Sequence, residues 1–526
     1  MAGVDRPMRH PDVIVVGAGS AGCTLAARLS EDPARRVLLL EAGGDDPAAR
    51  RSPSPLADAR RLPPFKEAAY DWGLVDEPSD AARAPIALPR GRVVGGSSAV
   101  NGTFAMRGSR EDYDGWSALG LPGWGFDEVL PVFRALERDL DYGDRPWHGD
   151  EGPVPIRRHT DAERSVAART YLAATRRAGH PDAPDHNAPD AVGAGPLPVN
   201  AIDGVRMSTA LTHLEPARGR ANLTVRPHAQ VDRVLIERGR ALGVRLVDGE
   251  RITAGTVVLA AGAYASPAIL LRSGVGPGDE LAEHGIASVA DLPGVGRNLA
   301  DHPMVLFRLV VPAESAPHTN YQAMVTWRSD GGVGPPDLHL FAWGPVRVDA
   351  PAPVGARLGV NVGLLDPRSR GRVRLAGSDP SILPRIDLAY LEDPEDAARM
   401  VAGVREALRI AATEPLASYA RGIEGAFSAT MSDDVLEAIV RSEVRTYHHP
   451  VGTCRMGPAG DAGAVVDARG RVHAVDDLVV ADASIMPTVP RANTHLPTVM
   501  VAERIARWFA SADDEPRHRQ NMAMSS

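Results

Sequence analysis

The sequence contains almost no lysine: Lys66 is the one lysine among 58 basic residues, and the others are arginine. Such a bias is typical of a GC-rich genome, but it also excludes chemistry. A P-loop requires the triplet Gly-Lys-Ser/Thr, which the sequence does not contain. A Schiff-base enzyme would depend on Lys66 alone. We therefore expect neither a P-loop nucleotide site nor imine catalysis.

Cysteine is nearly as scarce, because Cys23 and Cys454 are the two cysteines in 526 residues. Two widely separated cysteines cannot form a disulfide framework, and a CxxC redox motif is absent. The sequence also lacks HExxH and any Cys/His cluster with zinc spacing. We expect no metal site, and Cys454 is interpreted as a packing residue.

Long apolar runs and clustered positive charge are missing as well. No run of 18 apolar residues occurs, so we expect no membrane span, and the polar residues 1–11 do not resemble a signal peptide. We therefore expect a cytoplasmic protein. The net charge of −9 is spread along the chain, which argues against nucleic acid as a partner. The length favours two to four domains.

The first regular pattern that is present lies near the N-terminus. Val13–Val16 is expected to be a buried strand, Cys23–Leu29 part of a helix, and Val37–Leu40 a second strand. Between strand and helix, residues 17–22 read GAGSAG and match G-x-G-x-x-G. In such a turn Gly17 permits the tight bend, Gly19 admits a pyrophosphate, and Gly22 allows the helix to pack closely on the strand.

Glu41 follows the second strand, where a carboxylate can accept hydrogen bonds from both ribose hydroxyls. Its negative charge disfavours a 2′-phosphate, so NADP is not expected. Residues 18–22 could also be read as a hydrolase nucleophile elbow around Ser20. That reading leaves Glu41 unexplained, and dinucleotide binding is preferred.

Further strands and helices follow the same logic. Paired strands are expected at Val231–Glu237 and 242–247, and apolar strands at 256–260 and 478–481. Ser266 and Pro267 are expected to open a helix that stops at Gly274. Strands at 338–343 and 359–365 and a helix at 396–412 indicate a second domain. A helix over 498–511 is expected to close the fold, with a disordered tail at 512–526.

Five ordered motifs spread over most of the chain make it similar to the glucose–methanol–choline (GMC) oxidoreductases. They are GRVVGGSSAVNG (91–102), GAYASPAILLRSGVGP (262–277), GVGRNLADHP (294–303), HPVGTCRMG (449–457) and VADASIMPTVPRANTHLPT (480–498). The resemblance implies an α/β fold: a Rossmann-like FAD-binding domain and a discontinuous α+β substrate domain built on an antiparallel sheet. We place the FAD domain at 10–302 and 445–511, with excursions at 43–90 and 150–200, and the substrate domain at 303–444.

The resemblance also implies which residues bind FAD. Gly17, Gly19, Gly22 and Glu41 would hold its ADP half, and Val231 would meet the adenine. Gly95, Gly96, Ser97 and Asn101 would lie against the flavin and ribityl, with Asp482, Ala483 and Thr494 beside them. Ser20, Ala42, Arg92 and Val93 complete the predicted set. Some relatives attach FAD covalently through a histidine where this chain has Val100, so we expect non-covalent FAD.

Alcohol oxidation needs a base for the hydroxyl proton and an acceptor for the hydride, and a neutral imidazole suits the first task. His449 matches the base of the family. His448 is the competing candidate, and only one of two adjacent side chains should face the flavin if the segment is extended. His495 is expected to be the partner that hydrogen-bonds the substrate oxygen, with Asn493 as the alternative. His302 is interpreted as structural.

The expected function is FAD-dependent oxidation of a small-molecule alcohol to a carbonyl. Related hydroxynitrile lyases keep flavin without net redox chemistry, so a lyase is the alternative, and a flavoprotein binding module is a third. The electron acceptor stays open between oxygen, a quinone and another redox carrier. Aromatic residues make up 5% of the chain, which argues against an aromatic-lined pocket for aryl alcohols.

Overall fold

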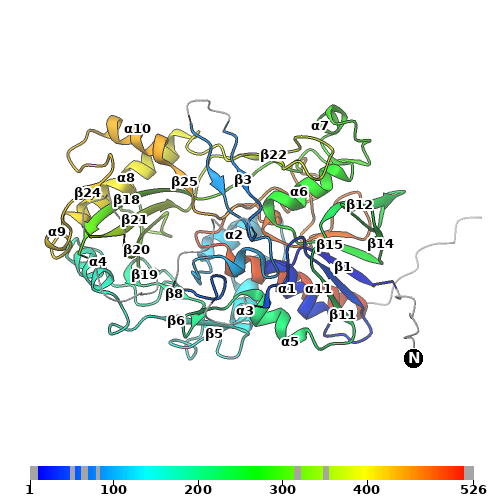
Figure 1. Cartoon of the computed structure of the whole chain (residues 1–526), viewed down its shortest axis with the longest axis horizontal. Helices are drawn as coiled ribbons and strands as arrows, with labels where there is room; N and C mark the ends of the chain where they lie inside the picture. The colour runs from blue at the N-terminus through cyan, green and yellow to red at the C-terminus, as the bar shows by residue number, and fades with distance from the viewer. Residues whose placement is uncertain are drawn as a thin grey trace, which may run out of the picture.

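The computed structural model describes residues 10–47, 54–60, 69–78, 83–312, 321–347 and 355–514. Two sheets with their covering helices form the two halves that Figure 1 shows side by side. Lys66 and the 515–526 part of the predicted tail lie outside the described residues, while residues 512–514 belong to the last helix.

The first half is built on a parallel sheet of order β11-β2-β1-β15-β26. These strands are Leu223–Arg226, Val37–Leu40, Val13–Val16, Thr256–Leu259 and Leu478–Val480. Every neighbouring pair is parallel, and β1, β15 and β26 are buried nearly throughout. Continuous Val/Leu runs of this kind are typical of parallel strands covered on both faces. The carboxyl ends of β1, β2, β15 and β26 therefore meet at one edge.

Helices α1 (Ser20–Leu29) and α11 (His495–Asp514) pack against each other beside this sheet. Helix α6 (Gly262–Arg272) follows β15. It begins five residues before Pro267, the predicted first helical residue after the N-cap Ser266, because the carboxylate of Asp482 accepts from the backbone N–H of Gly262 at 2.8 Å and so caps the helix there. Asp482 lies 220 positions away in the chain, and local sequence signals do not report such a partner.

The second half is an antiparallel sheet of order β24-β18-β21-β20-β19-β7, with β25 also pairing with β18. Its long strands are β18 (Pro303–Val311), β19 (Tyr321–Trp327), β20 (Leu338–Arg347) and β21 (Ala356–Leu364). The short strands are β7 (Gly193–Pro196), β24 (Ile423–Glu424) and β25 (Arg445–Thr446). Strand β7 comes from the stretch 150–200, so this part of the predicted excursion joins the substrate-domain sheet.

Helices α4 (Val166–Arg177) and α8 (Pro394–Ala411) pack on the antiparallel sheet, and α10 (Asp433–Glu443) packs on α8. The predicted strand pair is present as β12 (Val231–Glu237) and β13 (Arg240–Leu246), extended by β14 (Arg251–Thr253). Arg238 and Gly239 connect them with φ of 50° and 75°, as a tight hairpin requires.

The remaining elements connect or border these layers. The other helices are α2 (Arg110–Ala118), α3 (Phe126–Leu136), α5 (Glu215–Ala217), α7 (Gly278–Glu283) and α9 (Leu416–Tyr419). One π-helical turn spans Ala210–Leu214. Short 3₁₀ turns span Gly96–Ala99 and Ala483–Ile485. Small strands are Leu74–Val75, Ala87–Leu88, Glu137–Asp139, Val154–Arg158, Pro198–Val199, Ala201–Ile202, Val205–Arg206, Val275–Gly276, Ala290–Asp291, Arg372–Arg374 and Arg385–Asp387.

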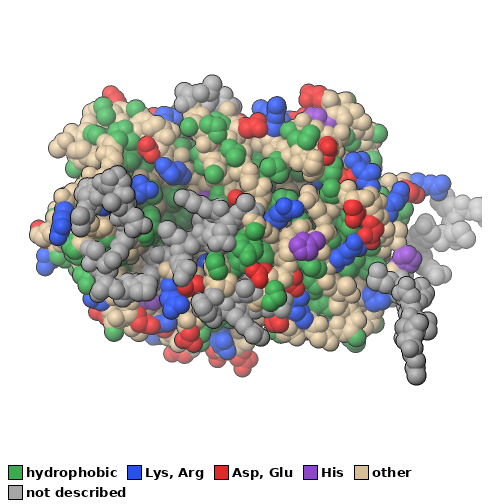
Figure 2. All heavy atoms as spheres, viewed as in Figure 1, with side chains coloured by type: hydrophobic (Ala, Val, Ile, Leu, Met, Phe, Trp, Pro, Cys, Tyr) green, Lys and Arg blue, Asp and Glu red, His purple; other side chains and the backbone are tan. Residues whose placement is uncertain are grey.

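Basic and acidic side chains are interspersed over the face that Figure 2 shows. Among the described helices, none has the length and apolar character needed to cross a bilayer.

Candidate functional site

A long cavity runs between the two halves of the molecule. At one end it is lined by Glu41 and Val231 from the edge of the parallel sheet, and at the other by Phe341 and Asn361 from the antiparallel sheet. His449 lines the same cavity, near Phe341: Tyr447 lies 4.4 Å from the ring of His449 and 5.2 Å from that of Phe341. A site at the carboxyl ends of parallel strands is the expected place for a dinucleotide in such a fold.

Two glycine-rich loops meet at the floor of the cavity. Gly17 has φ of +97°, as the bend after β1 requires, and the backbone N–H of Gly95 donates to the carbonyl of Ala18 at 2.7 Å. A Cβ on Gly96 would lie 2.6 Å from the Cα of Gly19, and Gly96 has φ of +51°. Both loops therefore depend on glycine where they touch, and each leaves backbone open to the cavity.

Helix α1 directs its N-terminus at this floor. It has no side-chain cap and no acidic residue in its first turn, so its end remains available to an anion. A Cβ on Gly22 would lie 1.7 Å from the carbonyl oxygen of Gly17, which explains why the helix packs so closely on the turn. Beside the turn, the Glu41 carboxylate accepts from the N–H groups of Ala18 and Gly43, each at 2.8 Å.

Asp482 holds the opposite side of the cavity in place. It accepts from the N–H of Gly262 at 2.8 Å, the hydroxyl of Ser266 at 2.6 Å and the N–H of Ser484 at 2.8 Å. Because these bonds use its carboxylate oxygens, Asp482 organises the loop after β26 and presents that loop's backbone to the cavity.

Most of the predicted cofactor residues line this cavity: Gly17, Gly19, Ser20, Glu41, Ala42, Gly96, Ser97, Asn101, Val231, Asp482, Ala483 and Thr494. The remaining four lie behind its wall. They are Gly22, Gly95, Val93, which is buried and bridges to Gly44, and Arg92, whose guanidinium lies 5.1 Å from the ring of Trp72. We interpret these four as supports of the two glycine loops.

His449 is held from its backbone and from both ring nitrogens. Its N–H donates to Asp301 at 2.7 Å, and Asp301 also accepts from the hydroxyls of Thr446 at 2.6 Å and Tyr390 at 2.7 Å. Nδ1 of His449 lies 2.9 Å from Nδ1 of His302, and Nε2 lies 3.1 Å from Nδ2 of Asn493. The imidazole therefore has a single well-defined orientation.

These contacts also set the protonation of His449. If the amide of Asn493 donates to Nε2, then Nε2 carries the lone pair and Nδ1 carries the proton that is shared with His302. Burial lowers the pKa of His449 well below its ordinary value, and the neighbouring His302 and His448 lower it further. The ring is consequently neutral near pH 7, with a basic nitrogen at the cavity wall.

The structure does not bring His495 to His449 as expected; it brings Asn493. His495 is the first residue of α11, and its Nδ1 lies 3.1 Å from the hydroxyl of Ser20 at the start of α1. A helical start separates the directions of Asn493 and His495, although both line the cavity. Burial and the nearby His213 lower the pKa of His495 to about 4. It thus lies beside the N-terminus of α1.

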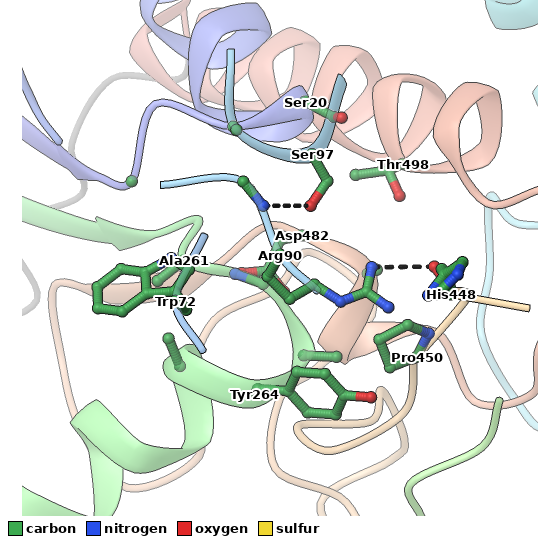
Figure 3. A pocket seen from close by; sticks show the side chains of 18 of the residues that line it. Ser20, Trp72, Arg90, Ser97, Ala261, Tyr264, His448, Pro450, Asp482 and Thr498 are labelled. Carbon is green, nitrogen blue, oxygen red and sulfur yellow. Dashed lines mark hydrogen bonds between the residues drawn. The ribbon is translucent and has the colours of Figure 1, made fainter. Parts of the chain in front are cut away.

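His448 also lines the cavity, but its backbone is left-handed, with φ of +70°. The simple alternation expected for an extended segment therefore does not apply. Arg90 extends across the cavity toward it, as Figure 3 shows, and donates to its carbonyl oxygen at 2.9 Å. The guanidinium of Arg90 lies 5.5 Å from the centre of the Tyr264 ring.

Sequence reasoning did not identify Arg90, Asp301 or Tyr447. Arg90 precedes the second glycine loop directly, and its position in Pro-Arg-Gly-Arg was the available signal. Asp301 precedes His302 in the ADHP motif.

Cys23 and Cys454 are fully buried, and burial raises the pKa of the Cys23 thiol to about 12. Among the described residues, no group of His, Cys, Asp and Glu could hold a metal ion.

Comparison with known proteins identifies the family. The GMC oxidoreductase models match residues 11–304 and 367–502. The chain is 38% identical over 526 residues to a 5-(hydroxymethyl)furfural oxidase of Methylovorus sp. (strain MP688), covering 94% of this chain and 98% of that protein. It is 35% identical over 529 residues to an oxygen-dependent choline dehydrogenase of Photobacterium profundum, covering 94% and 92%.

A solved structure agrees with these matches. The pyridoxine 4-oxidase from Mesorbium loti is 34% identical, has a TM-score of 0.87, and covers 95% of this chain and 99% of its own. The two half-matches, the shared fold and the cavity geometry agree with one another. The chain therefore belongs to the GMC oxidoreductases, FAD-dependent enzymes that act on the alcohol groups of their substrates.

Proposed function

We propose that this enzyme oxidises an alcohol to a carbonyl with His449 as the base and Asn493 as its partner. The observation that carries the proposal is the contact between Nε2 of His449 and Nδ2 of Asn493 on the wall of the cofactor cavity. A neutral imidazole and a neutral amide side by side can hold one hydroxyl group between them.

The residues of the cavity fit FAD. The uncapped N-terminus of α1 suits the pyrophosphate, and Glu41 suits the ribose hydroxyls. The touching glycines Gly19 and Gly96 leave a floor that any side chain would fill. When bound, the flavin supplies the acceptor for the hydride that leaves the carbinol carbon.

The protein's own residues move the proton. Nε2 of His449 accepts the hydroxyl proton, and the resulting imidazolium keeps its Nδ1 proton directed at His302. The amide of Asn493 donates to the substrate oxygen as negative charge develops there. Asp301 contributes through the backbone, since it fixes the N–H of His449 and the hydroxyl of Thr446.

We further propose that FAD is held without a covalent bond. Val100 occupies the wall position at which some relatives carry a linking histidine, and its side chain has no nucleophilic atom. Denaturing the yellow protein and filtering it should therefore release all of the flavin. Flavin that stays with the polypeptide would contradict non-covalent binding.

Anaerobic addition of an alcohol tests the redox proposal directly. Bleaching of the oxidised flavin band, with one carbonyl formed for each flavin, is the expected result. Turnover while the flavin remains fully oxidised would instead favour the lyase alternative. Admitting oxygen, or a quinone without oxygen, to the reduced enzyme then measures which acceptor restores the band faster.

A further inference from the structure

The substrate end of the cavity gathers aromatic rings from segments that are distant in the chain. Phe104 follows the second glycine loop, Tyr321 opens β19, Phe341 lies in β20, and Tyr447 comes just before His448. All four line the cavity. A chain with 5% aromatic residues therefore concentrates four of them at one place.

The four rings form one continuous array. Phe104 meets Tyr321 edge-on at 4.9 Å and Phe341 at 5.3 Å between ring centres. Phe341 stacks on Tyr447 at 5.2 Å with an interplanar angle of 19°. Tyr447 in turn lies 4.4 Å from the ring of His449. The array thus ends at the base proposed above.

Glycine keeps part of this array open. A Cβ on Gly102 would lie 3.1 Å from Tyr321 and 3.3 Å from Phe104, and Gly102 itself lines the cavity. Because position 102 carries no side chain, the edges of both rings remain accessible from the cavity. A flat ligand can reach them there, whereas a bulky residue at 102 would cover them.

The charges at this end disfavour a cation. The two carboxylates among the lining residues, Glu41 and Asp482, are both engaged at the cofactor end. The other charged side chains among the lining residues are arginines, Arg90 and Arg272, and Arg90 lies close enough to His449 to help lower its pKa. Behind the wall, the buried Arg206 interacts with Tyr321 and with the carboxylate of Asp58, and burial lowers the pKa of Arg206 to about 10.

Taken together, the geometry points to an aromatic primary alcohol of the benzyl or furfuryl type as the substrate class, and against quaternary-ammonium alcohols. The ring of the substrate adds to the array of Tyr321 and Phe341, and its carbinol group reaches His449 and Asn493. Aromatic rings gain from edge-on and offset-stacked contacts beyond simple burial. A fixed positive charge beside the rings would meet no free carboxylate among the lining residues and would be repelled by Arg90. This inference rests on the proposed function.

Two matched substrate pairs test the inference on the holoenzyme with a dye acceptor. We expect kcat/KM for benzyl alcohol to exceed that for cyclohexylmethanol roughly tenfold, because the two differ in aromaticity at similar size. We expect the uncharged isostere of choline, with carbon in place of nitrogen, to exceed choline roughly tenfold or more. Equal values within the first pair, or a preference for choline in the second, would overturn the inference.

Variants locate the preference at the array. Phe341→Leu keeps an apolar side chain but removes a ring. It should reduce the ratio of kcat/KM for benzyl alcohol to kcat/KM for cyclohexylmethanol to a value of about 1–3. Phe307→Leu is the matched control, because Phe307 lies on β18 of the same sheet, separated from β20 by β21, and packs in a separate core with Phe427 at 5.9 Å. It should leave the ratio unchanged. Loss of the ratio in the control alone would contradict the assignment.

Binding separates this inference from the proposed function. In oxidised His449→Ala holoenzyme, benzyl alcohol should perturb the flavin absorbance with a roughly tenfold lower Kd than cyclohexylmethanol, measured before the slow residual reduction of the flavin. Equal Kd values would contradict the proposed aromatic site even if the wild-type enzyme oxidises alcohols. Failure of every alcohol to bleach wild-type flavin, with the binding preference intact, would instead count against the proposed reaction.

Discussion

The side-chain amide of Asn493 lies 3.1 Å from Nε2 of His449, while the ring of His495 points to the hydroxyl of Ser20 at 3.1 Å. Two residues that differ by two positions in the chain thus serve opposite ends of one cavity. The first meets the imidazole that we propose as the base, and the second meets the helix end that suits phosphate.

Replacing His449 with Ala should lower kcat/KM roughly a hundredfold to ten-thousandfold, the range for loss of a general base. FAD content should be unchanged, because His449 contacts Asn493, His302 and Asp301 rather than the glycine loops. Anaerobic stopped-flow spectroscopy measures the rate at which the alcohol reduces the flavin in each protein.

His448→Asn is the control for that variant. Arg90 binds the backbone carbonyl of His448, which the substitution keeps. We expect a loss in kcat/KM of less than about tenfold. A larger loss in His448→Asn than in His449→Ala would reverse the assignment of the base.

Asn493→Ala and His495→Ala should have separable effects. The first should slow flavin reduction roughly a hundredfold, as loss of a donor to the developing alkoxide does, with FAD retained. The second should weaken FAD retention while the bound fraction reduces at nearly the wild-type rate. Flavin-to-protein ratios and anaerobic reduction rates on the same samples distinguish them. If His495→Ala alone slowed reduction, the predicted histidine pair would regain support.

The Gly96→Ala variant should fail to retain FAD. Its added Cβ would lie 2.6 Å from the Cα of Gly19, and the residue has φ of +51°, so both the contact and the backbone oppose it. The flavin-to-protein ratio after gel filtration provides the measurement. Gly115→Ala in α2 serves as the control, since nothing lies within 4 Å of its Cβ. Alanine there should keep the flavin and stabilise the helix by about 0.5–1 kcal/mol.

The pH profile of kcat/KM should show an acid limb below the ordinary histidine pKa of 6.5. Burial and the neighbouring histidines lower the pKa of His449, so the basic form predominates at pH 7 and is lost only as the pH falls further. Activity should therefore be flat from pH 7 upward with respect to this group. An acid limb centred above pH 7 would contradict a neutral base in the free enzyme.

Acid should also destabilise the fold through its buried neutral histidines. Burial lowers the pKa of His302 and His448 to about 3 and that of His186 to about 4. These histidines take up protons near pH 6.5 in the unfolded chain but stay neutral in the folded protein at that pH. Their contribution to the free energy of unfolding is therefore fully present above pH 6.5 and declines as the pH falls toward 4. Tm values measured by calorimetry should therefore fall as the pH is lowered from 7.5 to 4.5.

His186→Gln isolates one of these contributions, because His186 is not among the lining residues of the cavity. The variant should show a shallower fall of Tm with acid than the wild type. An identical slope in both proteins would assign the acid sensitivity to other groups.

Much of the fold could be predicted from local patterns. The β-turn-α-β unit at 13–40 and the hairpin around Gly239 follow from apolar runs broken by glycine, and the structure contains both. Such elements are defined by neighbours in the chain. The predicted start of α6 differs from the observed one by five residues, because the residue that caps this helix is Asp482, at the end of another strand.

The sequence by itself determined the family, the cofactor turn and the position of the histidine motif, since each depends on residue types at short, ordered spacings. Only the tertiary structure decided which side chain meets His449, because the start of α11 turns Asn493 and His495 apart. It also decided that a chain poor in aromatic residues has an aromatic wall at one end of this cavity. Composition averages over the whole chain, whereas packing brings Phe104, Tyr321, Phe341 and Tyr447 to one end of one cavity.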